Sequence, residues 1–249
     1  MRLLLLVIVF INIIECIFSC FQAWNGGGTG AWYRVDTSCE YSFVSTDLNY
    51  CLPQIVNPSN ADGFYVSLGI FNRFNGYSLD IGLTYDINKS KWFSYGNDRI
   101  GWKSGSISID SQLNPCINVS LFFRNQSIHY VARTMNNSVV LGEDIYLSSQ
   151  IDPFLNLTND NINFGFYRFD SIAQTNETLK SGSRLLHAKL TNWMLQLYSG
   201  QYVTADEFYV ASNVRGFKPG ACCTKDEIQT ITIYEENKWN RSDLSIQYD

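Results

Sequence analysis

The stretch from Gly63 to Gly96 constrains the fold most, because its apolar residues recur with the period of a β-strand. Between Tyr77 and Asp86, apolar residues alternate with small or polar ones. Successive side chains of a strand point to opposite faces, so this alternation predicts a strand with one buried face. Apolar runs at 63–71 and 91–95 flank it, and Asn-Gly and Asp-Ile-Asn-Lys-Ser supply the intervening turns. The stretch therefore predicts a three-stranded antiparallel meander.

Similar patterns recur along the rest of the chain at intervals of about ten to fifteen residues, separated by turn signals. We expect further strands at 32–36, 39–45, 100–102, 105–110, 116–124, 127–133, 162–169, 184–197 and 228–234, and two shorter strands at best within 139–147. The segment 184–197 is long enough for a helix, but its alternation and the poor helix formers Thr191, Asn192 and Trp193 favour a strand. The connection from Cys51 to Asp62 and the tail from Asn240 to Asp249 are predicted to lie outside the sheets, the tail being mobile.

About a dozen strands and no clear helix predict an all-β chain. The expected architecture is an antiparallel two-sheet β-sandwich, a concanavalin-like jelly roll, because antiparallel sheets can bury one face and leave the other wet. The chain has 249 residues, and five scattered prolines with no low-complexity tract give no sign of a linker. We therefore expect one β-sandwich domain over residues 20–249, with its C-terminal segment tied on by disulfides.

The N-terminal residues match a secretory signal peptide. Arg2 precedes a run from Leu3 to Ile14 that is apolar except for Asn12. This run is too short to span a bilayer, which takes about 20 apolar residues, although a buried strand or an anchor is an alternative. Cleavage after Ser19 would remove residues 1–19. A lipoprotein site at Cys20 is a further alternative, which Phe18 fits poorly. No later run is long enough to span a membrane, so the mature chain is predicted to be extracellular.

The chain contains seven Asn-x-Ser/Thr sequons, roughly twice the number expected by chance. They begin at Asn88, Asn118, Asn125, Asn136, Asn156, Asn176 and Asn240. With the leader, they predict a glycoprotein of a eukaryotic secretory route. Asn118 falls within a predicted strand, so we expect its face to point to solvent while Ile117, Val119, Leu121 and Phe123 point inward.

Six cysteines remain after the expected cleavage, and an exported protein favours disulfides between them. The candidates are Cys20, Cys39, Cys51, Cys116, Cys222 and Cys223. Fifteen pairings are open; a bond from Cys39 to Cys51 would staple a short connection, and the adjacent Cys222 and Cys223 are expected to take different, distant partners. With no Cys-x-x-Cys pair and only two histidines, a zinc site is disfavoured.

Charge and composition limit the classes of molecule that the protein is expected to bind. The net charge is −5 and there is no basic patch, so nucleic-acid binding is not expected. Charged residues are 16% of the chain and aromatic residues 15%, which suits strands whose wet faces carry Ser, Thr, Asn and Tyr. We expect glycans or extracellular proteins as partners and no cofactor.

Several short motifs resemble those of small secreted concanavalin-like proteins of unassigned function. The resemblance covers about Gly63 to Tyr209 and rests on a "Gly-Leu-x-Tyr … Trp" hairpin and a later "Ile-Ala-Gln … Ser-Gly" segment. The matching residues are Asp80 to Asp86, Lys91 to Phe93, Arg168, Ser171 to Gln174, Ser181 to Ser183, Asn192 and Trp193. The resemblance implies a β-sandwich and a secreted protein, and it carries over no catalytic residue.

Enzyme chemistry finds little support in the motifs. Glycoside hydrolysis needs two carboxylates about 5 to 10 Å apart, and no strand carries two at suitable spacing, since Asp80 and Asp86 are six residues apart. A hydrolase or polysaccharide lyase would need carboxylates from separate strands. There is no Gly-x-Ser-x-Gly motif, so His129 and His187 are interpreted as ordinary sheet histidines. The Asn-rich segment 156–163 lacks the ordered spacing of a calcium loop.

A flat aromatic ring near the end of a strand can stack on a sugar. Trp92, Tyr95 and Trp102 lie near turns where their rings could reach solvent, and Asp80 is the carboxylate set within the clearest strand. These four residues are the candidate ligand-binding set. The sequence therefore favours a non-catalytic carbohydrate-binding or extracellular interaction module, with no metal site, over an enzyme.

Overall fold

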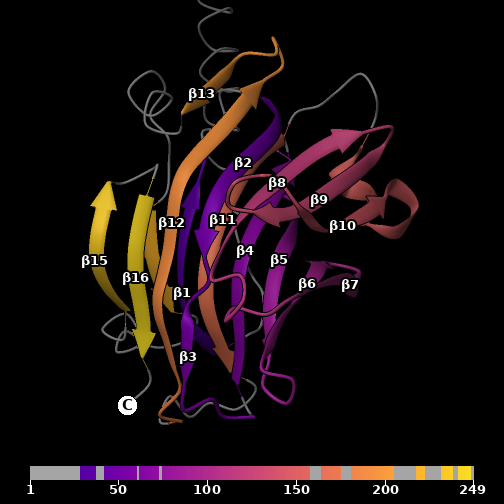
Figure 1. Ribbon diagram of the computed structural model, residues 1–249. Coiled ribbons are helices and arrows are strands. Elements are labelled where there is room, and N and C mark those ends of the chain that lie inside the picture. Colours follow the sequence, from indigo (N-terminus) through magenta and orange to yellow (C-terminus); the bar gives the residue numbers. More distant parts are fainter. Residues whose placement is uncertain are drawn as a thin grey trace, which may run out of the picture.

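The computed structural model describes residues 29–37, 42–60, 62–72, 75–157, 164–174, 181–204, 217–221, 231–237 and 241–247. These residues form two antiparallel β-sheets packed face to face, here called sheet A and sheet B, and the fold is a concanavalin-like β-sandwich (Figure 1). In Figure 1 sheet B lies in front, with β12 crossing over strands of sheet A. The all-β prediction is confirmed.

Within the described residues, sheet A has seven strands in the order β14-β1-β11-β4-β5-β6-β7. Their bounds are Phe217–Ala221 (β14), Thr29–Asp36 (β1), Phe164–Gln174 (β11), Asp62–Asn72 (β4), Ser78–Asp86 (β5), Lys91–Asp98 (β6) and Gly101–Ile109 (β7). Strands β4, β5 and β6 are the antiparallel meander that the sequence predicts. Tyr65 of β4 lies opposite Thr84 of β5, and Asp86 of β5 lies opposite Lys91 of β6. Chain neighbours thus form one half of the sheet, and β11 joins them to β1.

In the part of the chain that the structure describes, sheet B has nine strands. Seven of them follow the order β10-β9-β8-β2-β12-β16-β15, and β3 and β13 also pair with β12. Their bounds are Val140–Leu147 (β10), Ser127–Thr134 (β9), Cys116–Arg124 (β8), Phe43–Cys51 (β2), Arg184–Leu197 (β12), Arg241–Gln247 (β16), Ile231–Asn237 (β15), Gln54–Val56 (β3) and Tyr202–Thr204 (β13). Two single-turn 3₁₀ helices, Ser148–Gln150 (η1) and Pro153–Leu155 (η2), follow β10.

Four strands in these sheets, β3, β13, β14 and β16, were not expected from the sequence. The predicted mobile tail is wrong, because β16 lies between β12 and β15 within sheet B. Strand β3 lies inside the predicted surface connection, and β14 pairs with β1. The segments 100–102 and 105–110, expected as two strands, form the single strand β7. The segment 139–147 likewise forms a single strand, β10. Tertiary pairing supplies these strands with partners that their short, weakly patterned sequences do not reveal.

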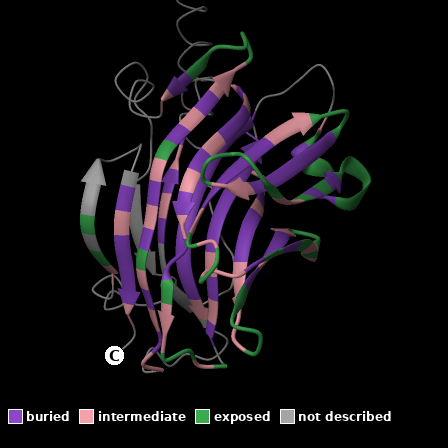
Figure 2. Cartoon of the chain, viewed as in Figure 1, coloured by how far each residue is buried: buried purple, intermediate pink, exposed green. Residues whose placement is uncertain are grey.

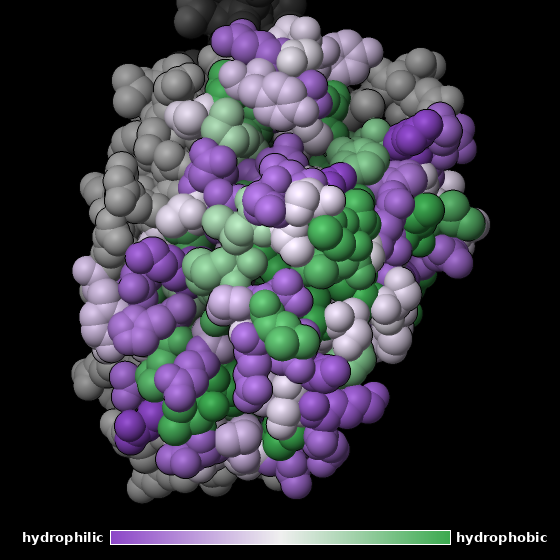
Figure 3. Space-filling view, in the orientation of Figure 1, coloured by the Kyte–Doolittle hydropathy of each residue, from purple (hydrophilic) through white to green (hydrophobic). Residues whose placement is uncertain are grey.

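The core lies between the sheets and is built from the alternate residues of each strand (Figure 2). In β5 the inward residues are Leu79, Ile81 and Leu83, as the alternation predicts. Strand β12 is interrupted by a β-bulge between Thr191 and Met194, which lets Trp193 point inward, fully buried, with its Nε1 donating to Thr46 Oγ1 at 2.7 Å. Figure 3 shows that the side chains on the sheet B side of the surface are of mixed hydropathy.

The expectation that Asn118 points to solvent is only partly correct. Ile117, Val119 and Leu121 are buried in the core, so the alternation is as predicted. Asn118 does lie on the outer face of sheet B, but only 8% of it is exposed. Its Nδ2 donates to Leu48 O at 3.4 Å and to Asn49 Oδ1 at 3.1 Å. Neighbouring side chains, and not solvent, surround this amide.

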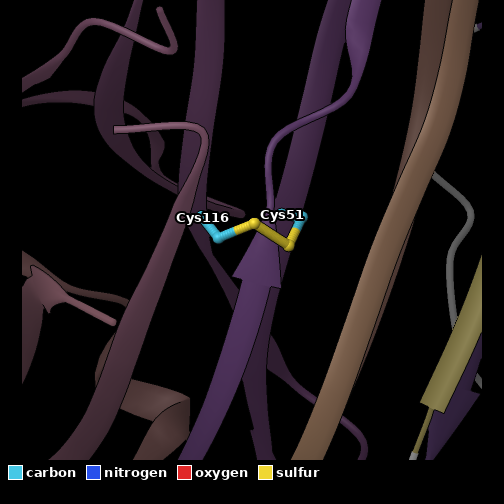
Figure 4. Close-up of a disulfide and its surroundings, with 2 residues drawn as sticks. All are labelled: Cys51 and Cys116. Carbon is cyan, nitrogen blue, oxygen red and sulfur yellow. A yellow bond between two sulfur atoms is a disulfide. The ribbon is translucent and has the colours of Figure 1, made fainter. Parts of the chain in front are cut away.

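One disulfide joins β2 to β8, between Cys51 and Cys116, which face each other in the register of the two strands (Figure 4). The suggested pairing of Cys51 with Cys39 is therefore wrong. It was attractive because the two are close in sequence, whereas strand pairing brings residues 65 positions apart into contact. Cys20, Cys39, Cys222 and Cys223 lie outside the described residues. No helix among the described residues is long and apolar enough to cross a membrane.

Candidate functional site on the outer face of sheet A

The outer face of sheet A carries a polar and aromatic cluster arranged in two rows that run across the strands. The first row contains Asp36, Tyr167, Gly69, Asp80, Asn97 and Trp102, one from each of β1, β11, β4, β5, β6 and β7. The second row, one step along the strands, contains Arg34, Phe169, Ser67, Gly82, Tyr95 and Ser104. Their chain neighbours point into the core, so these side chains share the outer face.

In the first row, the ring of Tyr167 crosses over Gly69 and its hydroxyl donates a hydrogen bond to Asp80 Oδ1. A Cβ added at Gly69 would lie 2.1 Å from Cζ of Tyr167, which is far inside van der Waals contact. Glycine at this position therefore allows a tyrosine on one neighbouring strand to reach an aspartate on the other. Tyr167 is fully buried by this packing, although it lies on the outside of the sheet.

The guanidinium of Arg34 covers the other side of the Tyr167 ring, at 3.7 Å from its centroid. Its Nε lies 2.5 Å from Oδ1 of Asp36, so the cation is paired as well as stacked. A planar guanidinium is suited to this double contact, which a lysine ammonium could not reproduce. Arg34 thus fixes the plane of the ring whose hydroxyl holds Asp80.

In the second row, too, a tyrosine hydroxyl reaches a polar side chain two strands away, and an aromatic stack lies at the end of the row. In the register of the strands Gly82 lies between Tyr95 and Ser67, and the Tyr95 hydroxyl shares a hydrogen bond with Ser67 Oγ. The indole of Trp102 lies parallel to the Tyr95 ring, with their centroids 4.5 Å apart. Tyr65 meets both rings edge-on, at 5.4 and 6.0 Å. Trp102 is 48% exposed, so a flat, firmly supported aromatic ring faces solvent here.

Burial sets the protonation of the cluster. Burial raises the pKa of Asp80, and the Tyr167 hydrogen bond and the charge of Arg34 oppose this only in part. Burial also raises the pKa of Tyr167 and of Tyr95 well above the ordinary value, and the charge of Asp80 adds to both shifts. Both phenols therefore stay protonated, and Tyr167 donates its proton to the hydrogen bond with Asp80. Asp80 is a carboxyl group that accepts from Tyr167 and holds its own proton at a higher pH than an ordinary aspartate.

Three of the four predicted ligand-binding residues meet on this face: Asp80, Tyr95 and Trp102. The fourth, Trp92, is fully buried in the core, so the expectation that its ring reaches solvent is wrong. Trp92 and Tyr95 are three residues apart on β6, and successive side chains of a strand alternate between its faces, so the two rings point to opposite faces. Tyr95 is only 2% exposed and supports Trp102 from beneath. Sequence reasoning missed Arg34, Tyr65 and Tyr167; the interior strand glycines Gly69 and Gly82 were the available signal of a close approach.

The two histidines lie on the outer face of sheet B. His129 Nδ1 lies 2.7 Å from Glu143 Oε1, and its Nε2 lies 2.9 Å from Ser127 Oγ. The Ser127 hydroxyl donates instead to the carbonyl of Arg124, so it accepts from His129. A nucleophilic serine would direct its proton to the histidine. His187 lies 3.0 Å from Asp243 Oδ1. The geometry favours two structural histidines.

Comparison with known proteins shows the fold. No protein-family model and no curated protein sequence matches the chain. Among solved structures, a scytalido-glutamic peptidase with a transition state analog inhibitor matches at a TM-score of 0.55 and 8% identity, over 88% of this chain and 98% of that one. SCP-B, a member of the eqolisin family of peptidases, matches at 0.45 and 9%, over 88% and 98%. LamAcat from Zobellia galactanivorans matches at 0.33 and 9%, over 83% and 62%.

Proposed function

We propose that this protein is an exported carbohydrate-binding protein that holds a sugar on the outer face of sheet A. The observation that carries this proposal is the half-exposed indole of Trp102, stacked on Tyr95 and placed in the same row as Asp80. An aromatic ring offers a flat apolar surface to the C–H face of a sugar ring. The carboxyl group of Asp80, two strands away in the same row, supplies the directional hydrogen bonds that fix a hydroxyl-bearing ligand.

The arrangement is rigid before any ligand arrives. Tyr65 and Tyr95 hold the indole from its edge and its underside, and Tyr167 and Arg34 hold Asp80 and its surroundings. Binding then costs little side-chain ordering, which is otherwise about 0.5–1.5 kcal/mol for each immobilised side chain. This preorganisation distinguishes the cluster from exposed single aromatics elsewhere, such as Tyr198, whose exposure is 70%.

Export is part of the proposal. The Cys51–Cys116 disulfide supports it, because disulfides persist in oxidising compartments. The leader-like N-terminus and the sequons of the sequence point the same way.

A glycan array probed with the purified, disulfide-intact protein tests the binding function. We expect at least one glycan to bind, and Trp102→Ala to weaken that binding at least tenfold in titration calorimetry. Asp80→Asn tests the carboxyl group separately. Tyr198→Ala is the matched control, because it removes an exposed aromatic ring away from the cluster, and it should bind as the parent does. Absence of binding to any glycan at millimolar concentration would remove the proposal.

Glycoside hydrolysis is a second candidate, favoured by the raised pKa of Asp80. A general acid needs to hold its proton near the working pH, which an ordinary aspartate does not do. Asp36, the other carboxylate of the row, lies three strands from Asp80, about 14 Å across the sheet, so the second carboxylate would have to come from another part of the chain. Release of reducing ends from a polysaccharide, abolished by Asp80→Asn with binding retained, would support an enzyme. Binding without release supports the non-catalytic role.

A further inference from the structure

A recessed surface lies on the outer face of sheet B, on the opposite side of the sandwich from Trp102. It is an open groove with a volume of about 650 Å³ that crosses β8, β2 and β12 and is bounded by β9 and β13. Its floor is polar: Ser45, Asp47, Asn118, Ser120, Arg133 and Gln196 all line it. The volume lies within the range of about 300–1,000 Å³ that is usual for ligand sites.

Three of these polar side chains are buried even though they lie on the outside of the sheet. Ser45, Asn118 and Ser120 are each less than a tenth exposed. Ser45 Oγ donates to Gln196 Oε1 at 2.9 Å, and Asn118 is held by β2. Buried polar groups cost free energy unless they are hydrogen-bonded, so these bonds fix the positions of the side chains in the floor.

Ser120 separates the two charges of the groove. Its hydroxyl donates to Asp47 Oδ1 and accepts from Arg133 Nη1 at 2.8 Å. No ion pair joins Asp47 to Arg133 within the described part of the chain, and the one hydrogen bond of the Arg133 guanidinium that we find there is the bond to Ser120. A guanidinium has five N–H donors in a planar fork. Four of them are therefore available at the edge of the groove.

Two residues at the rim of the groove have a left-handed backbone conformation. Asn192 has a φ of 56° within the β-bulge of β12, and Asn137 has a φ of 56° in the turn after β9; both line the groove. Bulges often redirect a side chain next to a binding site. At one end, the ring of Tyr202 in β13 is half-exposed. Amides and an aromatic ring thus surround the polar floor.

The position of the groove decides what kind of chain could lie in it. Peptides are often bound by adding a strand to a sheet edge, but β8, β2 and β12 are interior strands whose backbones are already paired on both sides. A ligand must therefore be recognised by side chains. Hydroxyl, amide and carboxylate groups suit the hydroxyls of an oligosaccharide, and the free fork of Arg133 suits a carboxylate, to which it can bond at two points.

We propose that this groove is a second binding site, which takes an oligosaccharide bearing a carboxylate, with Arg133 binding that carboxylate. The amides of Asn192 and Gln196 bind neighbouring hydroxyls, and Ser120 holds Arg133 in position through its bond to Asp47. Because Asn118 lies in the floor, the groove is open only when this sequon carries no glycan. The site is independent of the cluster on sheet A.

Titration calorimetry with two acidic probes, tetragalacturonate and sialyllactose, tests the site and distinguishes a uronate from a sialate ligand. At least one should bind, and its neutral counterpart, the methyl-esterified tetragalacturonate or lactose, should bind at least tenfold more weakly. Arg133→Gln should lose at least tenfold in affinity, and Arg133→Lys should recover part of it. Arg124→Gln, which removes an exposed arginine outside the groove lining, is the matched control and should bind normally. Trp102→Ala should also leave this binding unchanged.

Chemical-shift mapping on the parent protein keeps the test independent of any folding defect in the variants. The bound acidic probe should shift the amide signals of Ser120, Asn192 and Arg133. Binding of neither acidic probe, equal affinity for the neutral counterparts, or equal losses in Arg124→Gln and Arg133→Gln would overturn the proposal. A glycan found on Asn118 of the exported protein would overturn it as well.

Discussion

Tyr50 of β2 donates a hydrogen bond to the carboxyl group of Asp170 in β11, so a phenol of sheet B and an acid of sheet A meet inside the sandwich. Asp170 is buried, and burial raises its pKa to about 8. An ionised carboxylate in this apolar setting would be costly, so the acid is held protonated at neutral pH. The bond joins the two sheets without placing a charge between them.

This pKa predicts how stability depends on pH. An unfolded aspartate has a pKa of about 3.9, so the folded protein retains this proton over a range in which the unfolded chain has lost it. The contribution is fully present below about pH 4 and is lost as the pH rises through about 8, by up to about 1.4 kcal/mol per pH unit. Asp170→Asn should flatten this part of the profile. Denaturant unfolding from pH 4 to 9 measures it, and identical slopes in the two proteins would contradict the prediction.

The Tyr167 hydrogen bond should be visible in the titration of Asp80. This bond lowers the pKa of Asp80, against the larger effect of burial. Tyr167→Phe keeps the ring under Arg34 and removes the donor, so the pKa of Asp80 should rise further. Carboxyl-carbon NMR titration of the parent and the variant reports it. A pKa that stays the same or falls would show that Tyr167 does not bond Asp80 in solution.

Gly69→Ala should displace Tyr167. The added methyl group would overlap the ring, whose Cζ lies 2.1 Å from the Cβ position. Overpacking of this kind costs about 1–3 kcal/mol of folding free energy. The variant should also weaken sugar binding on sheet A, because Asp80 loses its support. The double variant Gly69→Ala, Tyr167→Leu should recover stability but not binding. If Gly69→Ala alone is as stable as the parent, the ring does not cross this glycine.

Removal of the Cys51–Cys116 disulfide should destabilise the fold. The bond closes a loop of 65 residues, for which chain-entropy arguments give about 4 kcal/mol. The double variant Cys51→Ser, Cys116→Ser should unfold at a correspondingly lower denaturant concentration. Non-reducing peptide mapping of the parent should recover the 51–116 crosslinked pair, and recovery of Cys51 bound to any other cysteine would contradict the pairing.

Sequon occupancy should follow exposure. Asn88 and Asn136 are exposed in turns, and we expect both to carry glycans in the exported protein. Asn118 should carry none, because its amide is buried and hydrogen-bonded to β2. Enzymatic deglycosylation in heavy-oxygen water, followed by mass spectrometry, distinguishes the sites. Glycans on Asn118 with Asn88 and Asn136 bare would reverse the expected order.

Local patterning determined the strands that alternate strongly. The run from Tyr77 to Asp86 predicted β5 and its two faces correctly, and β8 has the bounds that its pattern predicts. Burial of one sheet face imposes a period of two on the residues themselves, so this information is present in the sequence. The same period, counted with the right parity, separates Trp92 in the core from Tyr95 on the outer face.

Only the tertiary structure decided which strands lie side by side. Tyr167 and Asp80 are 87 positions apart, and the partner of Cys51 lies across a strand pair that no local pattern specifies. Strand β16 becomes ordered because β12 and β15 pair with it on both sides. Pairing between distant strands depends on the free energy of the whole sandwich, which single segments do not carry. For that reason the sequence could predict two sheets, and the fold had to show which side chains meet on their outer faces.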